Sequence, residues 1–236
     1  MTTLEIPRRF NGPAGMANGG YACGRLASLA SGTVTVRLLK PVPLDTSLEV
    51  VRDGDRLELR HGGDALAQLA PGTVGDLAVP PAPPFERAVD AARAYPGFAR
   101  HPAPTCYVCG PRRVPDDGLK LFPGAIGEWN GARMVAAPFV PDASLDAGDG
   151  SAASEIVWAA LDCPGYVACA QDMRPMLLGE LTAEIGRRPR IGERCVVVGL
   201  GLGGSGRKHE AGTVLYGEDG APIAKARAIW IEPRAA

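Results

Sequence analysis

The two halves of this 236-residue chain carry the same pattern of alternating apolar residues, and this repeat limits the folds the chain can adopt. The first copy reads GTVTVRLLKPVPLDTSLEVV and the second reads GELTAEIGRRPRIGERCVVV, at an offset of 147 residues. The offset places Val34 on Leu181 and Val36 on Ala183. In each copy the alternation predicts half-buried strands, separated by a turn that contains proline. The repeat therefore predicts two copies of one folding unit.

Each copy sits in the same order of expected elements. A helix pattern precedes it, over Asn18 to Ser28 in the first half and roughly Ala152 to Cys163 in the second, where Pro164 is expected to end the helix. The segment GLKLF, before the second helix, is expected to be a strand. A hairpin follows each copy, RLELRHGGDALAQLA in the first and EAGTVLYGEDGAPIAKARAIWI in the second. One helix with a curved antiparallel sheet around it predicts an α+β fold.

A proline-rich segment divides the chain near its middle. Residues 80–104 hold seven of the 22 prolines, which is typical of a linker, and they include an amphipathic helix pattern around Phe85 to Ala94. We therefore expect an N-terminal unit over residues 1–79 and a linker with a Cys-x-x-Cys pair over 80–117. A C-terminal unit is expected over 118–236.

Composition favours an ordinary globular protein of the cytoplasm. The chain is 46% hydrophobic and 22% charged, with a formal net charge of −1, so nothing points to nucleic acid. Its start has no apolar signal-peptide core, and no apolar run approaches the roughly 18 residues of a membrane span. Six cysteines in such a chain are expected to be reduced thiols.

The stretch MANGGYACGRLAS opens the first helix with two adjacent glycines. Asn18 is a good N-cap, but Gly19 and Gly20 each cost up to about 1 kcal/mol of helix stability relative to alanine. Two explanations remain open. Free N–H groups at a helix start can stabilise an oxyanion, and glycines would let a substrate reach them. Alternatively, the helix packs so tightly that side chains do not fit.

Three segments, FNGPAGMANGGYACGRLAS, EIVWAALDCPG and GRKHEAGTVLYGEDGAPIAKARAIWI, together with the repeat, resemble a known family. The chain resembles the double-hotdog thioesterase-like proteins, including the acyl-CoA thioesterase II group. The resemblance implies a tandem hotdog fold, each unit a curved antiparallel sheet wrapped around one central helix. It further implies an acyl-CoA or related thioester as substrate and no cofactor. A homodimer is one assembly that the chain could form.

In hotdog thioesterases the thioester carbonyl points at the start of one central helix, and the facing unit supplies a carboxylate. Many of them carry an acid nine residues after the residue that opens the helix. Here the ninth residue after Asn18 is Ala27, whereas aligning the second helix by Asp162 puts Ala153-Ser154-Glu155 at its entry. Only the combination of Asn18, Gly19 and Gly20 with Asp162 keeps both parts of such a site.

The resemblance thus implies roles for these residues. Asp162 would be the general base for a water molecule, and the amides of Gly19 and Gly20 would hold the oxyanion. We expect apolar neighbours and a helix C-terminus to raise the pKa of Asp162. Glu155 is either a second carboxylate in the pocket or a favourable acid in a first helical turn. Thiol release from acyl-CoA substrates would distinguish an enzyme from a binding protein without catalysis on the same scaffold.

Other candidates have weaker patterns. Basic residues that could bind coenzyme A phosphates, or simply be solvated, are Arg188, Arg190, Arg207 and Lys208. Cys106-x-x-Cys109 is half of a zinc site, but no second pair follows, so a redox pair and a turn of buried thiols remain alternatives. The string Gly199-x-Gly201-x-x-Gly204 matches a dinucleotide fingerprint, yet we expect a loop between strands there.

Overall fold

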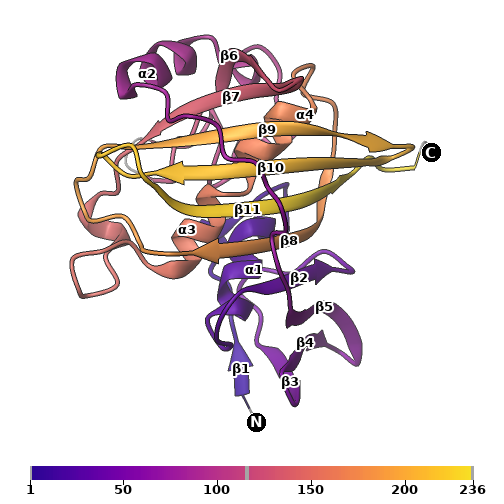
Figure 1. Ribbon diagram of the computed structural model, residues 1–236. Coiled ribbons are helices and arrows are strands. Elements are labelled where there is room, and N and C mark those ends of the chain that lie inside the picture. The colour runs from indigo at the N-terminus through magenta and orange to yellow at the C-terminus, as the bar shows by residue number, and fades with distance from the viewer. Residues whose placement is uncertain (1, 115–116, 235–236) are drawn as a thin grey trace.

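The computed structural model describes residues 2–114 and 117–234 and places the strands of these ranges in one antiparallel sheet (Figure 1). The strand order is β1-β3-β4-β5-β2-β8-β11-β10-β9-β7-β6. The N-terminal strands are β1 (Thr2–Leu4), β2 (Val34–Leu38), β3 (Leu48–Asp53), β4 (Arg56–His61) and β5 (Asp64–Pro71). The remaining strands are β6 (Gly124–Trp129), β7 (Ala132–Phe139), β8 (Leu177–Ile185), β9 (Cys195–Ser205), β10 (Lys208–Tyr216) and β11 (Pro222–Ile231).

Four α-helices accompany the sheet within the described ranges: α1 (Gly19–Ala27), α2 (Phe85–Arg93), α3 (Ser154–Ala160) and α4 (Cys163–Cys169). Short 3₁₀ turns cover Arg8–Phe10, Pro96–Phe98 and Ala143–Leu145. The predicted α+β class with antiparallel strands is confirmed. None of the helices in these ranges has the length and apolar character that a membrane crossing requires.

The two copies of the sequence repeat meet in the middle of the sheet, where β2 pairs with β8. Thr35 lies opposite Thr182, and the two hydroxyl oxygens are 2.7 Å apart. On either side, Val34 faces Ala183 and Val36 faces Leu181. In the sequence repeat, Leu181 is equivalent to Val34 and Ala183 is equivalent to Val36. The pairing therefore exchanges the two copies, as a two-fold axis between the two threonines would.

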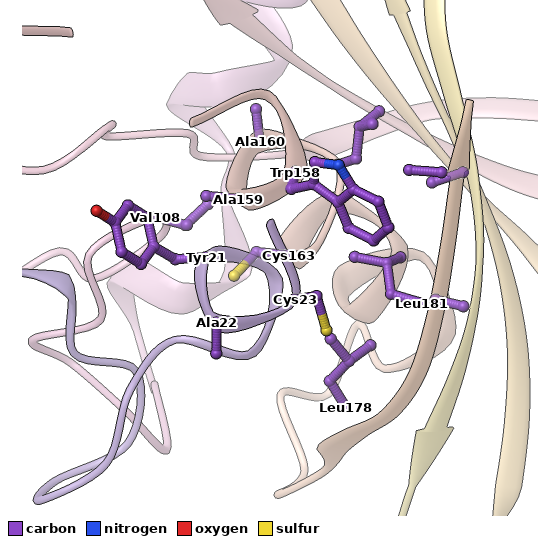
Figure 2. Close-up of a cluster of buried hydrophobic side chains, with 14 of the residues drawn as sticks. Tyr21, Ala22, Cys23, Val108, Trp158, Ala159, Ala160, Cys163, Leu178 and Leu181 are labelled. Carbon is purple, nitrogen blue, oxygen red and sulfur yellow. The ribbon is translucent and has the colours of Figure 1, made fainter. Parts of the chain in front are cut away.

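Helices α1 and α3 cross in close contact, and glycines make this possible. A Cβ atom on Gly20 would lie 2.5 Å from Cβ of Asp162, and one on Gly24 would lie 2.6 Å from Cα of Glu155. Figure 2 shows the buried cluster around this crossing, with Cys23 of α1 and Trp158 of α3 near Leu178 and Leu181 of β8. Gly20 and Gly24 therefore face the other helix, and only Gly19 faces the sheet.

The second helix differs from the expectation. α3 ends at Ala160, and a new helix, α4, begins at Cys163. Pro164 stands in the first turn of α4, where its missing N–H leaves no hydrogen bond unmade, so it begins a helix and does not end one. Asp162 consequently lies at the break between two helices, directly after the C-terminal end of α3 and before the start of α4.

Two further expectations were wrong in detail. GLKLF is not a strand: Leu119 and Leu121 donate their backbone N–H groups to the carbonyls of Tyr107 and Val108, so the segment lies along the Cys-x-x-Cys loop. The glycine-rich string from Gly199 to Gly204 is not a loop, because β9 runs through it. A side chain on Gly199 would collide with the Pro164 carbonyl, so this glycine lets α4 pack against β9.

The proline-rich segment is a packed part of the fold. Its helix α2 confirms the predicted helix and packs against β6 and β7. The buried Ala88 and Ala91 of α2 join Ile126, Val198 and Val214 in a second apolar cluster, separate from the main core. The residues that directly follow this segment carry Cys106 and Cys109 into the main core.

Candidate functional site

A cavity of about 320 Å³ opens where the start of α1, strands β2 and β8, the Cys-x-x-Cys loop and the α3–α4 break come together. Most of its wall is apolar and includes Leu38, Val42, Met176, Leu178 and Trp230. Its polar residues include Asn18, Asp162 and a group of cysteines. An apolar space with a few convergent polar groups is the usual form of a small-molecule site.

Asp162 lies at the start of α1, as the sequence analysis predicted, although it is far from this helix in the sequence. Its Oδ2 accepts hydrogen bonds from Nδ2 of Asn18 at 2.8 Å and from the backbone N–H of Gly20 at 2.9 Å. Asn18 is fixed in turn, because its Oδ1 accepts the N–H of Tyr21 at 2.8 Å and caps α1. The helix start thus holds one carboxylate oxygen in place.

The other carboxylate oxygen of Asp162 has no partner among the described residues. Oδ1 is buried without a hydrogen bond, and Asp162 as a whole is only 1% exposed. An unpaired buried acceptor costs about 1–3 kcal/mol, so the unpaired Oδ1 lowers the stability of the fold unless a partner binds it. A water molecule or a substrate group in the cavity is the natural partner for it.

Burial raises the pKa of Asp162 to about 7, and this is the larger effect on the group. The hydrogen bonds from Gly20 and Asn18 stabilise the charged form and oppose the rise. The direction of the shift agrees with the sequence analysis. Desolvation is the largest cause, and the charge of the nearby Cys106 sulfur adds to the rise.

The two glycines at the helix start have different roles. The amide of Gly20 is already bound to Asp162, so it has no hydrogen left for an oxyanion. The amide of Gly19 has no acceptor among the described residues, and Gly19 lines the cavity. Of the two amides that the sequence analysis paired, only that of Gly19 is available to a ligand.

Glu155 is not part of the cavity. It lies in the first turn of α3, and its Oε1 is 3.5 Å from Nη1 of Arg25. Ala153, at the N-cap of α3, offers no side-chain hydrogen bond to the helix. The reading of Glu155 as a second carboxylate beside Asp162 is therefore wrong, and the reading as a first-turn acid fits its position.

The four basic candidates for phosphate binding lie outside the cavity wall. Arg188 donates to the Ala152 carbonyl and pairs with Asp149, and the backbone of Arg190 binds Glu193, so both lie away from Asp162. Arg207 and Lys208 lie closer, because Arg207 donates to the carbonyl of Glu232 and Lys208 pairs with Ile231 of the cavity wall. The sequence analysis missed Lys40, which lines the cavity and pairs with Asp64 at 2.7 Å.

The structure adds a third sulfur to the Cys-x-x-Cys pair. The Sγ atoms of Cys106, Cys109 and Cys163 all lie within 4.8 Å of one another, and those of Cys106 and Cys163 are 3.9 Å apart. Nε2 of His101 lies 3.4 Å from Sγ of Cys109. Cys163 and His101 look like isolated residues in the sequence, and the position of Cys163 directly after Asp162 was the one signal that could have identified it.

Comparisons with known proteins bear on the fold. A comparison with models of protein families finds no match to this chain, and a comparison with curated proteins finds none either. Solved structures do match. A tesB protein of Mycobacterium avium subspecies paratuberculosis is 14% identical, with a TM-score of 0.61 over 98% of this chain and 92% of that one.

Two further structures match over nearly the whole chain. A candidate thioesterase II from Thermobifida fusca is 16% identical, with a TM-score of 0.59 over 98% of this chain and 92% of that one. A protein from Alicyclobacillus acidocaldarius, described as having a hot dog fold, is 12% identical, with a TM-score of 0.58 over 99% and 93% of the two chains. At these identities the likeness shows a shared fold, and the hotdog fold implied by the sequence is confirmed.

Proposed function

We propose that this protein is a thioester hydrolase that cleaves acyl-CoA or a related thioester in the cavity beside Asp162. One observation carries the proposal: Oδ1 of Asp162 is buried and unpaired where the start of α1 meets the cavity, while Asn18 and Gly20 hold Oδ2. A carboxylate oriented in this way has one oxygen fixed and one oxygen available for a proton. The names of the Thermobifida protein and of a candidate oleoyl thioesterase from Lactobacillus plantarum agree with the proposal.

The reaction follows from the positions of these groups. Oδ1 of Asp162 takes a proton from a water molecule as the water oxygen attacks the thioester carbonyl. The carbonyl oxygen becomes an oxyanion, and the free amide of Gly19 at the positive end of α1 stabilises it. The carbon–sulfur bond then breaks, the thiolate leaves, and the proton held by Asp162 passes to it. The apolar wall formed by Leu38, Met176 and Leu178 accommodates an acyl chain.

We further propose that the fold is a tandem hotdog, with units over 1–79 and 118–236 that arose by duplication. The two-fold register around Thr35 and Thr182 supports this. The segment 80–117 is then more than a linker, because its Cys-x-x-Cys loop forms one wall of the cavity. The site is composite: Asn18 and Gly19 come from the first unit and Asp162 from the second.

A panel of acyl-CoA substrates tests the proposed activity. Purified protein is mixed with acyl-CoAs of increasing chain length, and the free thiol that forms is measured with a thiol reagent against a blank without protein. Release of coenzyme A above the blank for at least one substrate is the expected result. If acyl-CoAs bind, by calorimetry, and none releases thiol, the protein is a binding protein on the same scaffold and the proposed hydrolysis is wrong.

A further inference from the structure

The three-cysteine cluster formed by Cys106, Cys109 and Cys163 is not explained by the proposed reaction. All three side chains are buried, and all three line the same cavity. Buried single cysteines usually act as small apolar residues. Three sulfurs that converge from two distant segments of the chain need a further explanation.

The spacing of the sulfurs fits a tetrahedral zinc ion. Zinc–sulfur bonds of about 2.3 Å at tetrahedral angles place two ligand sulfurs about 3.8 Å apart. The sulfurs of Cys106 and Cys163 are 3.9 Å apart, and no pair in the cluster exceeds 4.8 Å. Thiolates are soft ligands that favour zinc over magnesium or calcium.

Nitrogen groups that can donate hydrogen bonds lie beside two of the three sulfurs. Nδ2 of Asn18 lies 3.9 Å from the sulfur of Cys106 and is oriented to donate to it. The tight turn after the pair is closed by the N–H of Gly110, which donates to the Cys106 carbonyl at 2.9 Å. Donors of this kind stabilise and orient ligands around a metal.

His101 supports the cluster from outside. Its Nδ1 accepts the backbone N–H of Ala103 at 2.9 Å, so in the neutral ring Nε2 carries the proton. That proton points to Sγ of Cys109 at 3.4 Å. His101 therefore donates a hydrogen bond to a sulfur and does not offer a lone pair to a metal.

We propose that Cys106, Cys109 and Cys163 bind one Zn²⁺ ion and that its fourth coordination position faces the cavity. Three protein ligands with one open position are the arrangement of reactive zinc sites, in contrast to closed four-ligand structural sites. A water molecule or a thiol in the cavity would occupy that position. The ion would also tie the Cys-x-x-Cys loop to the α3–α4 break, directly beside Asp162. The proposal does not depend on thioester hydrolysis.

Metal analysis of the purified full-length protein tests this. The protein is expressed with zinc in the medium, passed through gel filtration under reducing conditions, and analysed for metals. We expect about one zinc per chain, and near-complete loss in Cys106→Ser and Cys163→Ser. The matched control is Cys169→Ser, which changes a half-buried cysteine on the same helix as Cys163 and should keep the zinc. Absence of zinc from the wild type, or equal loss in the control, would overturn the proposal.

A second measurement uses only the wild-type chain, so it does not depend on whether the variants fold. Zinc is removed with a chelator and replaced by Co²⁺. Three thiolate ligands predict an intense thiolate-to-cobalt charge-transfer absorption together with the visible bands of a tetrahedral ion. A weak octahedral spectrum, or a mass that shows a disulfide in place of free thiols, would contradict the site.

His101→Ala separates the two kinds of ligand arrangement. Loss of a hydrogen-bond partner around a metal site costs roughly 10–100-fold in affinity. We therefore expect His101→Ala to retain zinc at stoichiometric concentration with an affinity weaker by about that factor. Complete loss of zinc, equal to that in the cysteine variants, would make His101 a ligand and refute the open fourth position.

Discussion

Replacement of Gly24 by alanine tests the contact between α1 and α3. In a helix that touches nothing, Gly24→Ala would stabilise the protein by about 1 kcal/mol. Here the new Cβ would lie 2.6 Å from Cα of Glu155 and 2.7 Å from Cβ of Trp158. Both atoms belong to the rigid part of α3, so the helices must separate by roughly an ångström to restore van der Waals distance.

Overpacking of a core typically costs about 1–3 kcal/mol, and the cost is higher when backbone must move. Because backbone must move here, we expect a cost near the upper end of this range, about 3 kcal/mol. After subtraction of about 1 kcal/mol for the gain in helix propensity, Gly24→Ala should lower the free energy of unfolding by about 2 kcal/mol. For a chain of this size each kcal/mol corresponds to about 2–4 °C in Tm. Urea and thermal unfolding, followed by circular dichroism, measure both quantities.

Gly186→Ala is the control for this experiment. A Cβ on Gly186 meets only the Ile223 carbonyl, at an ordinary 3.4 Å. We expect its Tm to stay close to that of the wild type. If Gly24→Ala also leaves Tm unchanged or raises it, the tight crossing of the two helices is refuted, and the glycines would need another explanation.

Three further outcomes follow from the structure. Thr35→Val should lower the free energy of unfolding by about 1–2 kcal/mol, because it leaves the buried hydroxyl of Thr182 unpaired. In urea unfolding, the double variant with Thr182→Val should recover part of this loss. Additive losses would contradict the hydrogen bond between the two threonines. Glu155→Gln should leave thiol release within about threefold of wild type, since Glu155 lies outside the cavity; a hundredfold loss would return it to the site. Arg187 lowers the pKa of Glu193 to about 2, so this pair should stabilise the fold above pH 4.5 and lose its contribution as pH falls from about 4.5 toward 2. Unfolding of Glu193→Gln, measured at several pH values, should lack that part of the acid sensitivity.

The sequence predicted those features that depend on local pattern or on the repeat. The alternation around Val34 and Leu181 predicted the strands, and the cap at Asn18 predicted the start of α1. The pairing of Asn18 with Asp162, which are 144 residues apart, followed from comparing the two helices as copies of one unit. Such a comparison contains long-range information because the two helices that it aligns, α1 and α3, pack against each other.

The features that were missed depend on tertiary contacts that no local pattern contains. Pro164 is a helix breaker in most contexts, and only the break in the helix after Ala160 places it in the first turn of α4. A side chain at Gly20 would collide with α3 and Asp162, and helix propensity contains no information about this contact. Cys163 meets Cys106 and Cys109 because the described residues 80–109 reach the main core, and the sequence analysis treated these residues as part of a linker.

The central claim is that Asp162 is the base of a single composite hydrolytic site, and Asp162→Asn tests it most directly. The amide can still accept from Asn18 and Gly20 and keeps the shape of the side chain, but it cannot take the proton. A general base typically contributes about 10²–10⁴ in rate. On the acyl-CoA that the wild type hydrolyses best, steady-state thiol release should show kcat reduced by that factor, with KM changed little. A kcat for Asp162→Asn within about threefold of the wild-type value would contradict the claim.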